Sequence, residues 1–289
     1  MPTPENPKPE HPSTYFVEDR SNLDEMNRLQ IQDRMLTEGM GGVLVEQPDS
    51  ERFERVLDVG CGTGGWLIEV AKTYPSISLL VGIDISQRML DFARARAEAE
   101  GVSDRVEFHV MDALRMLEFP NDFFSLVNQR LGWGYLRTWD WPKLLQEFQR
   151  VARPGGVVRV TESDLGRNTS SAAMQLIELS QKAFYQSGHL FTPTGDGVIG
   201  QLARLLQRHG LQNVRTRTYT LEYPFGSPGW QLALEDMRLV YRTMRPFLEK
   251  WVHIPDNYEE IYQQALRDVQ QPDCVGGLTL LTAWGTKSV

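Results

Sequence analysis

The stretch Val56-Leu57-Asp58-Val59-Gly60-Cys61-Gly62-Thr63-Gly64-Gly65-Trp66 decides the fold of this 289-residue chain. An apolar run breaks into alternating glycines, and a helical pattern follows at residues 67–71. The pattern predicts a strand, a tight turn and the start of a helix. Because glycine has no Cβ and tolerates positive φ, a ligand can lie against the backbone of such a turn. The N-terminus of the helix adds unpaired N–H groups and a partial positive charge.

The glycine spacing separates two classes of ligand. The dinucleotide fingerprint is G-x-G-x-x-G, with an acidic residue about 20 residues further on. Here Gly60, Gly62 and Gly64 give G-x-G-x-G, and Asp58 precedes the first glycine by two positions. A carboxylate that faces the loop repels a pyrophosphate and attracts a positive charge. The sequence therefore favours a cationic nucleoside over NAD.

Residues 58–64 closely resemble motif I of the class I S-adenosylmethionine-dependent methyltransferases. Three more strand-end motifs follow in the order of that family, at residues 79–86, 106–113 and 123–129, and then a helix, a Pro-Gly-Gly turn and a fifth strand at 144–162. The resemblance implies an α/β fold with a Rossmann-like, seven-stranded, mostly parallel sheet whose last strand is antiparallel. It also implies S-adenosyl-L-methionine as the cofactor and S-adenosyl-L-homocysteine as the product.

The resemblance assigns cofactor contacts to the strand ends. Asp84 is similar to the family's ribose-binding acid, and Ile85 would pack on the adenine face. Asp112 resembles the acceptor of the adenine amine, with the Ala113 N–H reaching N1 and Met111 against the ring.

The same resemblance places the methionine end of the cofactor beside Asn128 and Gln129, at the end of the fourth strand. A helix before motif I resembles the lid helix of many small-molecule methyltransferases, so Tyr15 and Arg28 could touch the cofactor's amino-acid end or the substrate. The glycine-loop contacts would come from Asp58, Gly60, Cys61, Gly62 and Gly64.

Composition limits the partners. The net charge is −8, and no run of Lys and Arg with interleaved aromatics occurs, so a nucleic acid is not expected. Two distant cysteines, Cys61 and Cys274, give no disulfide framework or metal spacing. No apolar stretch reaches membrane-spanning length and the N-terminus is polar, so we expect a cytoplasmic protein without a membrane partner. Monomer and homodimer both stay open.

The pattern along the chain predicts four regions: a disordered tail at 1–14, a lid-helix region at 15–48, the methyltransferase core at 49–222 and 274–289, and a helical insertion at 223–273. Helices are expected at 172–187, 195–209, 231–251 and 258–269, and the last two strands at 214–222 and 277–286. Because ligands bind at the carboxyl edge of open α/β sheets, the insertion would cover the substrate pocket. Its aromatics could line that pocket or pack the insertion onto the sheet: Trp230, Tyr241, Phe247 and Trp251.

The expected chemistry is in-line methyl transfer to a small, partly apolar molecule, in which positioning supplies much of the catalysis. A base is needed only when the acceptor carries a proton, and the candidates are Glu162, His189 and Tyr185. A structural role for Glu162 stays open. Two other functions also remain: a cyclase or isomerase that binds the cofactor without transferring methyl, and a non-catalytic partner of another methyltransferase.

Overall fold

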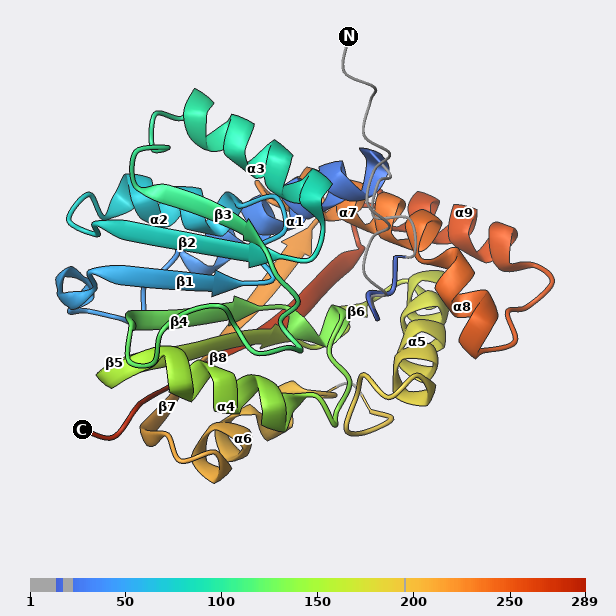
Figure 1. The fold of residues 1–289 in the computed structure, drawn as a ribbon. Coiled ribbons are helices and arrows are strands. Elements are labelled where there is room, and N and C mark those ends of the chain that lie inside the picture. The colour runs from blue at the N-terminus through green and yellow to red at the C-terminus, as the bar shows by residue number, and fades with distance from the viewer. Residues whose placement is uncertain (1–13, 18–22, 195) are drawn as a thin grey trace, which may run out of the picture.

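The computed structural model describes residues 14–17, 23–194 and 196–289. Of the predicted disordered tail, residues 1–13 therefore lie outside the described residues, as do residues 18–22 of the predicted lid-helix region. The C-terminus ends beside β5 and β7, at the opposite side of the molecule from the insertion helices (Figure 1). None of the described helices combines the length and hydropathy needed to span a bilayer.

A mixed sheet forms the centre of the molecule. Its order is β3-β2-β1-β4-β5-β8, and both β6 and β7 pair with β8. The first five strands along the chain are parallel, whereas β8 runs antiparallel to its neighbours. The strands are β1 (Arg55–Val59), β2 (Leu79–Asp84), β3 (Val106–Val110), β4 (Phe124–Arg130), β5 (Ala152–Ser163), β6 (Arg167–Asn168), β7 (Gln212–Pro224) and β8 (Val275–Thr286). The predicted fold class is confirmed, with the two-residue β6 as an addition.

Helices cover both faces of this sheet (Figure 1). Val56 of β1 packs in a core with α2 (Gly65–Thr73) and α3 (Gln87–Ala99), while the next residue, Leu57, packs in the other core with α4 (Trp141–Val151) and α6 (Leu202–Arg208). Successive strand residues point to opposite faces, so a strand buried on both faces needs a continuous apolar run. This explains the adjacent apolar pairs Val56-Leu57 in β1 and Leu126-Val127 in β4, whose members pack in opposite cores.

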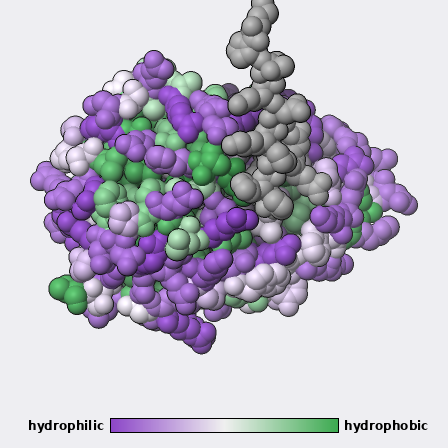
Figure 2. All heavy atoms as spheres, in the orientation of Figure 1, coloured by the Kyte–Doolittle hydropathy of each residue, from purple (hydrophilic) through white to green (hydrophobic). Residues whose placement is uncertain are grey.

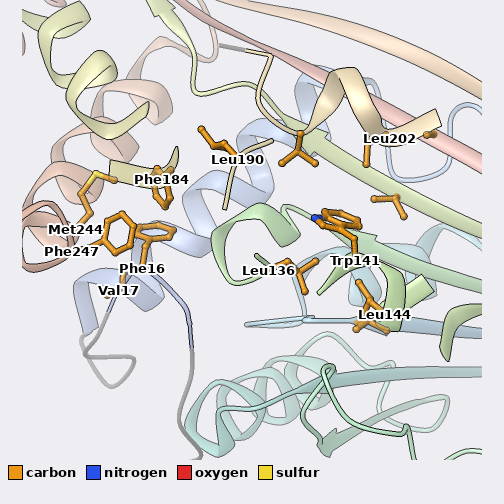
Figure 3. Close-up of a cluster of buried hydrophobic side chains, with 14 of the residues drawn as sticks. Phe16, Val17, Leu136, Trp141, Leu144, Phe184, Leu190, Leu202, Met244 and Phe247 are labelled. Carbon is orange, nitrogen blue, oxygen red and sulfur yellow. The ribbon is translucent and has the colours of Figure 1, made fainter. Parts of the chain in front are cut away.

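The remaining helices gather at the end of the sheet toward which the parallel strands point (Figure 1). They are α1 (Leu23–Met40), α5 (Ser171–Gln186), α7 (Trp230–Thr243), α8 (Arg245–Trp251) and α9 (Tyr258–Asp268). Helix α1 packs against α7, and α5 packs against α8 and α9. Figure 3 shows Phe16 of the N-terminal segment beside Phe184 of α5 and Phe247 of α8. The carboxyl edge of the sheet therefore lies under helical cover.

Two predicted helices are shorter than expected. The predicted helix at 231–251 divides at Met244 into α7 and α8, because Pro246 lies in the first turn of α8, where its ring suits a helix start but not a helix interior. The predicted helix at 195–209 is reduced to the 3-10 turn Ile199–Gln201 followed by α6. Two further 3-10 turns are Ser50–Arg52 and Gly132–Gly134.

Hydrophilic residues cover most of the face shown in Figure 2, and a group of hydrophobic residues lies over the β2 and β3 side of the sheet. The exposed apolar side chains include Val110, at the end of β3, and Met116 in the loop that follows.

Candidate functional site

A cavity of about 240 Å³ lies at the carboxyl edge of the parallel strands. Its walls come from residues 14–16, from α1, from the segments that follow β1, β2, β3 and β4, and from Val240 of α7. Segments that are far apart in the sequence therefore meet around one space.

The glycine loop forms the floor of this cavity. Gly60, Gly62 and Gly64 all have positive φ, between 53° and 73°. The backbone N–H groups of Gly60 and Cys61 both donate to the carbonyl of Ile83 at 2.9 Å, which ties the loop to the end of β2. A Cβ on Gly60 would lie 2.6 Å from the Tyr135 hydroxyl, so only glycine fits there. Gly60, Cys61 and Gly62 line the cavity, whereas Gly64 packs against neighbouring side chains behind it.

Asp84 holds the loop from the other side. Its Oδ2 accepts a hydrogen bond from the Gly62 N–H at 3.0 Å, and its Oδ1 accepts one from the Ser86 N–H at 2.9 Å. Asp112 is held similarly, because its Oδ1 accepts from the Leu114 N–H at 2.9 Å. Both carboxylates line the cavity, together with the predicted adenine neighbours Ile85, Met111 and Ala113. The structure thus brings the five predicted adenosine-side residues together.

Asp58 lies at the inner end of a buried polar chain. Asn128 donates to Asp58 at 2.7 Å and accepts from Arg159 at 2.7 Å, and Arg159 pairs with Glu46 at 2.6 Å. Burial raises the pKa of Asp58 to about 7, and the Asn128 hydrogen bond opposes that rise. Asp58 lines the cavity, whereas Asn128 lies behind it. Arg159 and Glu46 were not predicted from the sequence, although a charged residue inside the apolar fifth strand is a signal.

Two predicted residues lie behind the cavity wall. Gln129 is fully buried and does not line the cavity. Glu162 is also fully buried, and its carboxylate accepts the N–H groups of Gly132 at 2.8 Å and Trp133 at 3.2 Å. Burial raises the pKa of Glu162 to about 8. Glu162 therefore holds the 3-10 turn that follows Leu131, whose φ of 54° is unusual for a residue other than glycine.

The other two predicted catalytic side chains also lie outside the lining of the cavity. Tyr185 is 44% exposed on α5. His189 is buried, with Nε2 3.1 Å from the Thr14 carbonyl and Nδ1 2.8 Å from the Ser187 hydroxyl. Burial lowers the pKa of His189 to about 4, so the ring is neutral near pH 7 and its Nε2–H donates to Thr14. In this structure neither side chain lines the cavity: His189 holds the N-terminal segment at Thr14, and Tyr185 is exposed on α5, so their catalytic roles stay predictions.

Tyr15 and Arg28 line the cavity, but Arg28 already has partners. Its guanidinium donates to both carboxylate oxygens of Glu25, at 2.8 and 2.7 Å, and to Asp236 of α7 at 3.2 Å. It also donates to the Tyr15 hydroxyl at 3.1 Å. Thr243 of α7 donates to Glu25 at 3.2 Å. This buried cluster joins α1 to α7, a role that the sequence did not reveal.

Aromatic side chains form the wall of the cavity near the end of β4. Tyr15, Phe16 and Trp133 line the cavity, and the rings of Phe16 and Trp133 are nearly parallel at a centroid distance of 6.1 Å. The insertion aromatics lie elsewhere. Tyr241 and Phe247 are buried in the core, and the Trp230 indole donates to the Val269 carbonyl at 2.9 Å. Of the two roles considered for these aromatics, lining the pocket or packing the insertion, the structure shows packing.

The glycine loop after β1 and the carboxylates of Asp84 and Asp112 at the ends of β2 and β3, on a sheet of this order, resemble those of the class I S-adenosylmethionine-dependent methyltransferases. Residues 56–156 match the family model described as a methyltransferase domain. The chain resembles this class, and the family model covers residues 56–156 of its 289 residues.

The chain is also similar in sequence to curated methyltransferases. The chain is 32% identical over 155 residues to a demethylmenaquinone methyltransferase of Symbiobacterium thermophilum, covering 52% of this chain and 59% of that protein. It is 31% identical over 147 residues to the methyltransferase GfsG of Streptomyces halstedii, covering 49% of each chain. The chain thus spans between half and three fifths of the length of these two relatives.

Solved structures show the same fold. Phosphoethanolamine N-methyltransferase 2 of Haemonchus contortus, in complex with phosphomonomethylethanolamine and S-adenosylhomocysteine, gives a TM-score of 0.56 at 19% identity, covering 95% of this chain and 60% of that one. The [4+2]-cyclase SpnF gives a TM-score of 0.51 at 19% identity, covering 92% and 95%. At these identities the likeness concerns the fold alone.

Proposed function

We propose that this protein binds S-adenosylmethionine in the cavity at the carboxyl edge and transfers its methyl group to a small, partly apolar molecule. The observation that carries the proposal is the division of one cavity into two ends. One end has the glycine loop and the carboxylates of Asp84 and Asp112, and the other has the aromatic wall of Tyr15, Phe16 and Trp133.

The residues at the first end fit the cofactor. Asp84 is fixed by two backbone N–H groups in a position to accept ribose hydroxyls, and Met111 and Ile85 supply apolar contact for a purine. Gly60 and Gly62 line the cavity and have no side chains, so the chain linking ribose and methionine can approach their backbone. Asp58 supplies a carboxylate for the positive charge of the ligand.

The cofactor supplies a sulfonium methyl that is already a strong electrophile, so the protein's part is to bind, orient and exclude water. Among the described residues that line the cavity, the groups that titrate are aspartates, Cys61, Tyr15 and Tyr135. Burial raises the pKa of both tyrosines well above the usual range, so neither phenol is a base near pH 7. An acceptor that carries a proton therefore has Asp58, whose pKa burial raises to about 7, as its candidate base, and an acceptor that is nucleophilic by itself needs none.

The charges of the second end favour an acceptor without an anionic group. The cationic side chains among the described lining residues are Arg28 and Arg130, and both already face carboxylates, Arg28 facing Glu25 and Arg130 facing Asp33. A phosphate would enter without a free cation, at a high desolvation cost. We therefore propose an uncharged acceptor held by the aromatic wall. Helix α7, which contributes Val240 to the lining, would cover it, in line with the predicted role of the insertion.

Two successive experiments test this function. Calorimetry with S-adenosylhomocysteine tests the cofactor site, and absence of binding would reject the proposal. Methyl-labelled cofactor with a panel of quinols, phenols, polyketide hydroxyls and amines, including phosphoethanolamine, then tests the transfer. The expected result is label in an uncharged acceptor and formation of S-adenosylhomocysteine. Cofactor that stays unchanged while a substrate isomerises would indicate a cyclase, and absence of turnover by the isolated chain would favour a non-catalytic partner.

A further inference from the structure

The turn that follows β4, residues 131–135, depends on the end of the neighbouring strand β5. Leu131 enters the turn with a φ of 54°, a region that residues other than glycine rarely occupy. The Glu162 carboxyl group accepts the N–H groups of the next two residues, one on each oxygen, Gly132 at 2.8 Å and Trp133 at 3.2 Å. Glu162 is fully buried, so its loss would leave these N–H groups without a partner in the protein interior.

The carbonyl groups of the same turn hold the N-terminal segment, residues 14–17. The Phe16 N–H donates to the Gly134 carbonyl at 3.2 Å, and the Thr14 hydroxyl donates to the Tyr135 carbonyl. The turn therefore lies between the end of β5, which binds its N–H groups, and the N-terminal segment, which binds its carbonyl groups.

Aromatic packing joins the same two pieces of chain. The Phe184 ring of α5 lies edge-on to both Phe16 and Trp133, at centroid distances of 5.4 and 4.8 Å. Ser163, the last residue of β5, accepts the Trp133 indole N–H at 3.1 Å. Two consecutive residues of β5 thus fix Trp133, Glu162 through its backbone and Ser163 through its indole.

Other contacts of the N-terminal segment come from outside the turn. The His189 ring donates to the Thr14 carbonyl at 3.1 Å, and Arg28 donates to the Tyr15 hydroxyl at 3.1 Å. Neither contact involves the backbone of Phe16. The exchange of the Phe16 N–H with solvent therefore reports on the contact between the segment and the turn.

We propose that Glu162 is the positioning residue of the acceptor end: by holding the turn after β4 it also holds the N-terminal segment, and so sets the place of the Phe16 and Trp133 rings against the cavity. This inference rests on the proposed function, which assigns the aromatic wall to the acceptor. Glu162 does not line the cavity, so it acts through the turn and not by contact with a ligand. The turn and the segment should accordingly open as one unit.

Native-state amide exchange of the wild-type chain, followed by NMR, tests this unit without any variant. We expect the N–H groups of Phe16, Gly132 and Trp133 to have protection factors within about threefold of one another and the same dependence on urea, because one opening exposes all three. Protection factors that differ by more than this, or that respond differently to urea, would overturn the inference.

Glu162→Gln tests the direction of the link. An amide nitrogen, unlike either carboxyl oxygen, has no lone pair for an N–H donor, so this variant keeps one of the two hydrogen bonds and opposes the other. The protection of the Phe16 N–H should fall about 10-fold or more, together with that of Gly132 and Trp133, while the amides of β1 keep theirs. The matched control is Glu54→Gln, which changes a 63% exposed carboxylate just before β1 and should alter none of these amides. A fall confined to Gly132 and Trp133 would contradict the link to the segment.

Acceptor kinetics test the positioning role itself. With the acceptor that takes the label in the transfer assay, Glu162→Gln should raise the acceptor KM about 10-fold and leave the affinity for S-adenosylhomocysteine within about threefold, because the glycine loop and Asp84 belong to other segments. Ser163→Ala frees only the Trp133 indole, so it should raise the acceptor KM about threefold and leave the Phe16 N–H protected.

The outcomes separate this inference from the function. Equal losses of affinity for cofactor and acceptor in Glu162→Gln would overturn the positioning role. No transfer by a wild-type chain that binds S-adenosylhomocysteine would overturn the proposed function and with it the acceptor role of Glu162, whereas the joint opening would stand on the exchange data. Separate opening of the turn and the segment in a chain that does transfer methyl would overturn this inference alone.

Discussion

Truncation of Asp84 gives the sharpest test of the cofactor site. The carboxylate accepts the Gly62 and Ser86 N–H groups at 3.0 and 2.9 Å, and we expect its outer face to accept ribose hydroxyls. Loss of charge-assisted bonds to a ligand costs about 1.5–3 kcal/mol, so Asp84→Ala should weaken S-adenosylhomocysteine binding about 10- to 150-fold. The two backbone bonds predict a separate loss of folding stability, about 0.5–1.5 kcal/mol for each.

The two effects are measured independently. Calorimetry gives the dissociation constant, and urea unfolding without ligand gives the stability. Asp91→Ala is the matched control, because it removes the same charge from a 61% exposed side chain on α3 and should change the dissociation constant by less than about twofold. Asp84→Asn, which keeps one acceptor oxygen, should give an intermediate affinity. A folded Asp84→Ala protein with an unchanged dissociation constant would refute the assignment.

Three more predictions concern buried and exposed polar groups. Burial raises the pKa of Asp58 to about 7, so between about pH 4 and pH 7 the folded protein keeps a proton on Asp58 that the unfolded chain has lost. The unfolding free energy should therefore fall by about 1.4 kcal/mol per pH unit over this range because of Asp58. Urea unfolding of Asp58→Asn should show this part of the pH dependence removed. Arg28→Met leaves Glu25 and Asp236 without their cation and should lower the unfolding free energy by about 3–5 kcal/mol; a loss below about 1 kcal/mol would contradict the cluster. Tyr185→Phe should leave the methyl-transfer rate within about twofold and the stability within about 0.5 kcal/mol, and a large rate loss would restore Tyr185 as a catalytic residue.

The sequence predicts the sheet and the adenosine side of the cavity because their determinants are local. A strand, a glycine turn and a helix start lie within residues 55–73, and the carboxylates of Asp84 and Asp112 follow directly from the strands that precede them. Parallel strands bring their carboxyl ends to one edge, so placing these residues needs only the strand order. The N-cap at Ser86 is equally local, since its hydroxyl accepts the Met89 N–H three residues later.

Helix boundaries beyond the core follow less well from periodicity. The apolar spacing continues from α7 into α8, and the division at Met244 depends on Pro246, a signal that was present in the sequence. The segment before α6 has helical spacing as well, but only a 3-10 turn forms there. Periodicity reports which side chains can face a core and not whether the backbone stays helical.

The polar contacts of the lid depend on chain segments that no sequence pattern relates. Arg28 meets Asp236 across 208 residues, and the His189 ring meets the Thr14 carbonyl across 175. From its sequence position alone, Arg28 could bind a ligand carboxylate or form an internal ion pair with Glu25. His189 could likewise act as a general base or form a buried structural hydrogen bond. Tertiary packing decides between these roles, because a buried charge or imidazole must find its partner inside the protein.

The two ends of the cavity differ in how much of their residue composition can be predicted from the sequence. The end proposed for the cofactor consists of backbone groups and of carboxylates that lie close to the strand ends in the sequence. The end proposed for the acceptor consists of Tyr15, Trp133 and Val240, which come from three distant segments. Changes at these positions would alter the acceptor without disturbing the loop that binds the cofactor. We therefore expect acceptor specificity to depend on the contact between α1 and α7, whose relative position the buried cluster around Arg28 fixes, because a buried charge without its partner is costly.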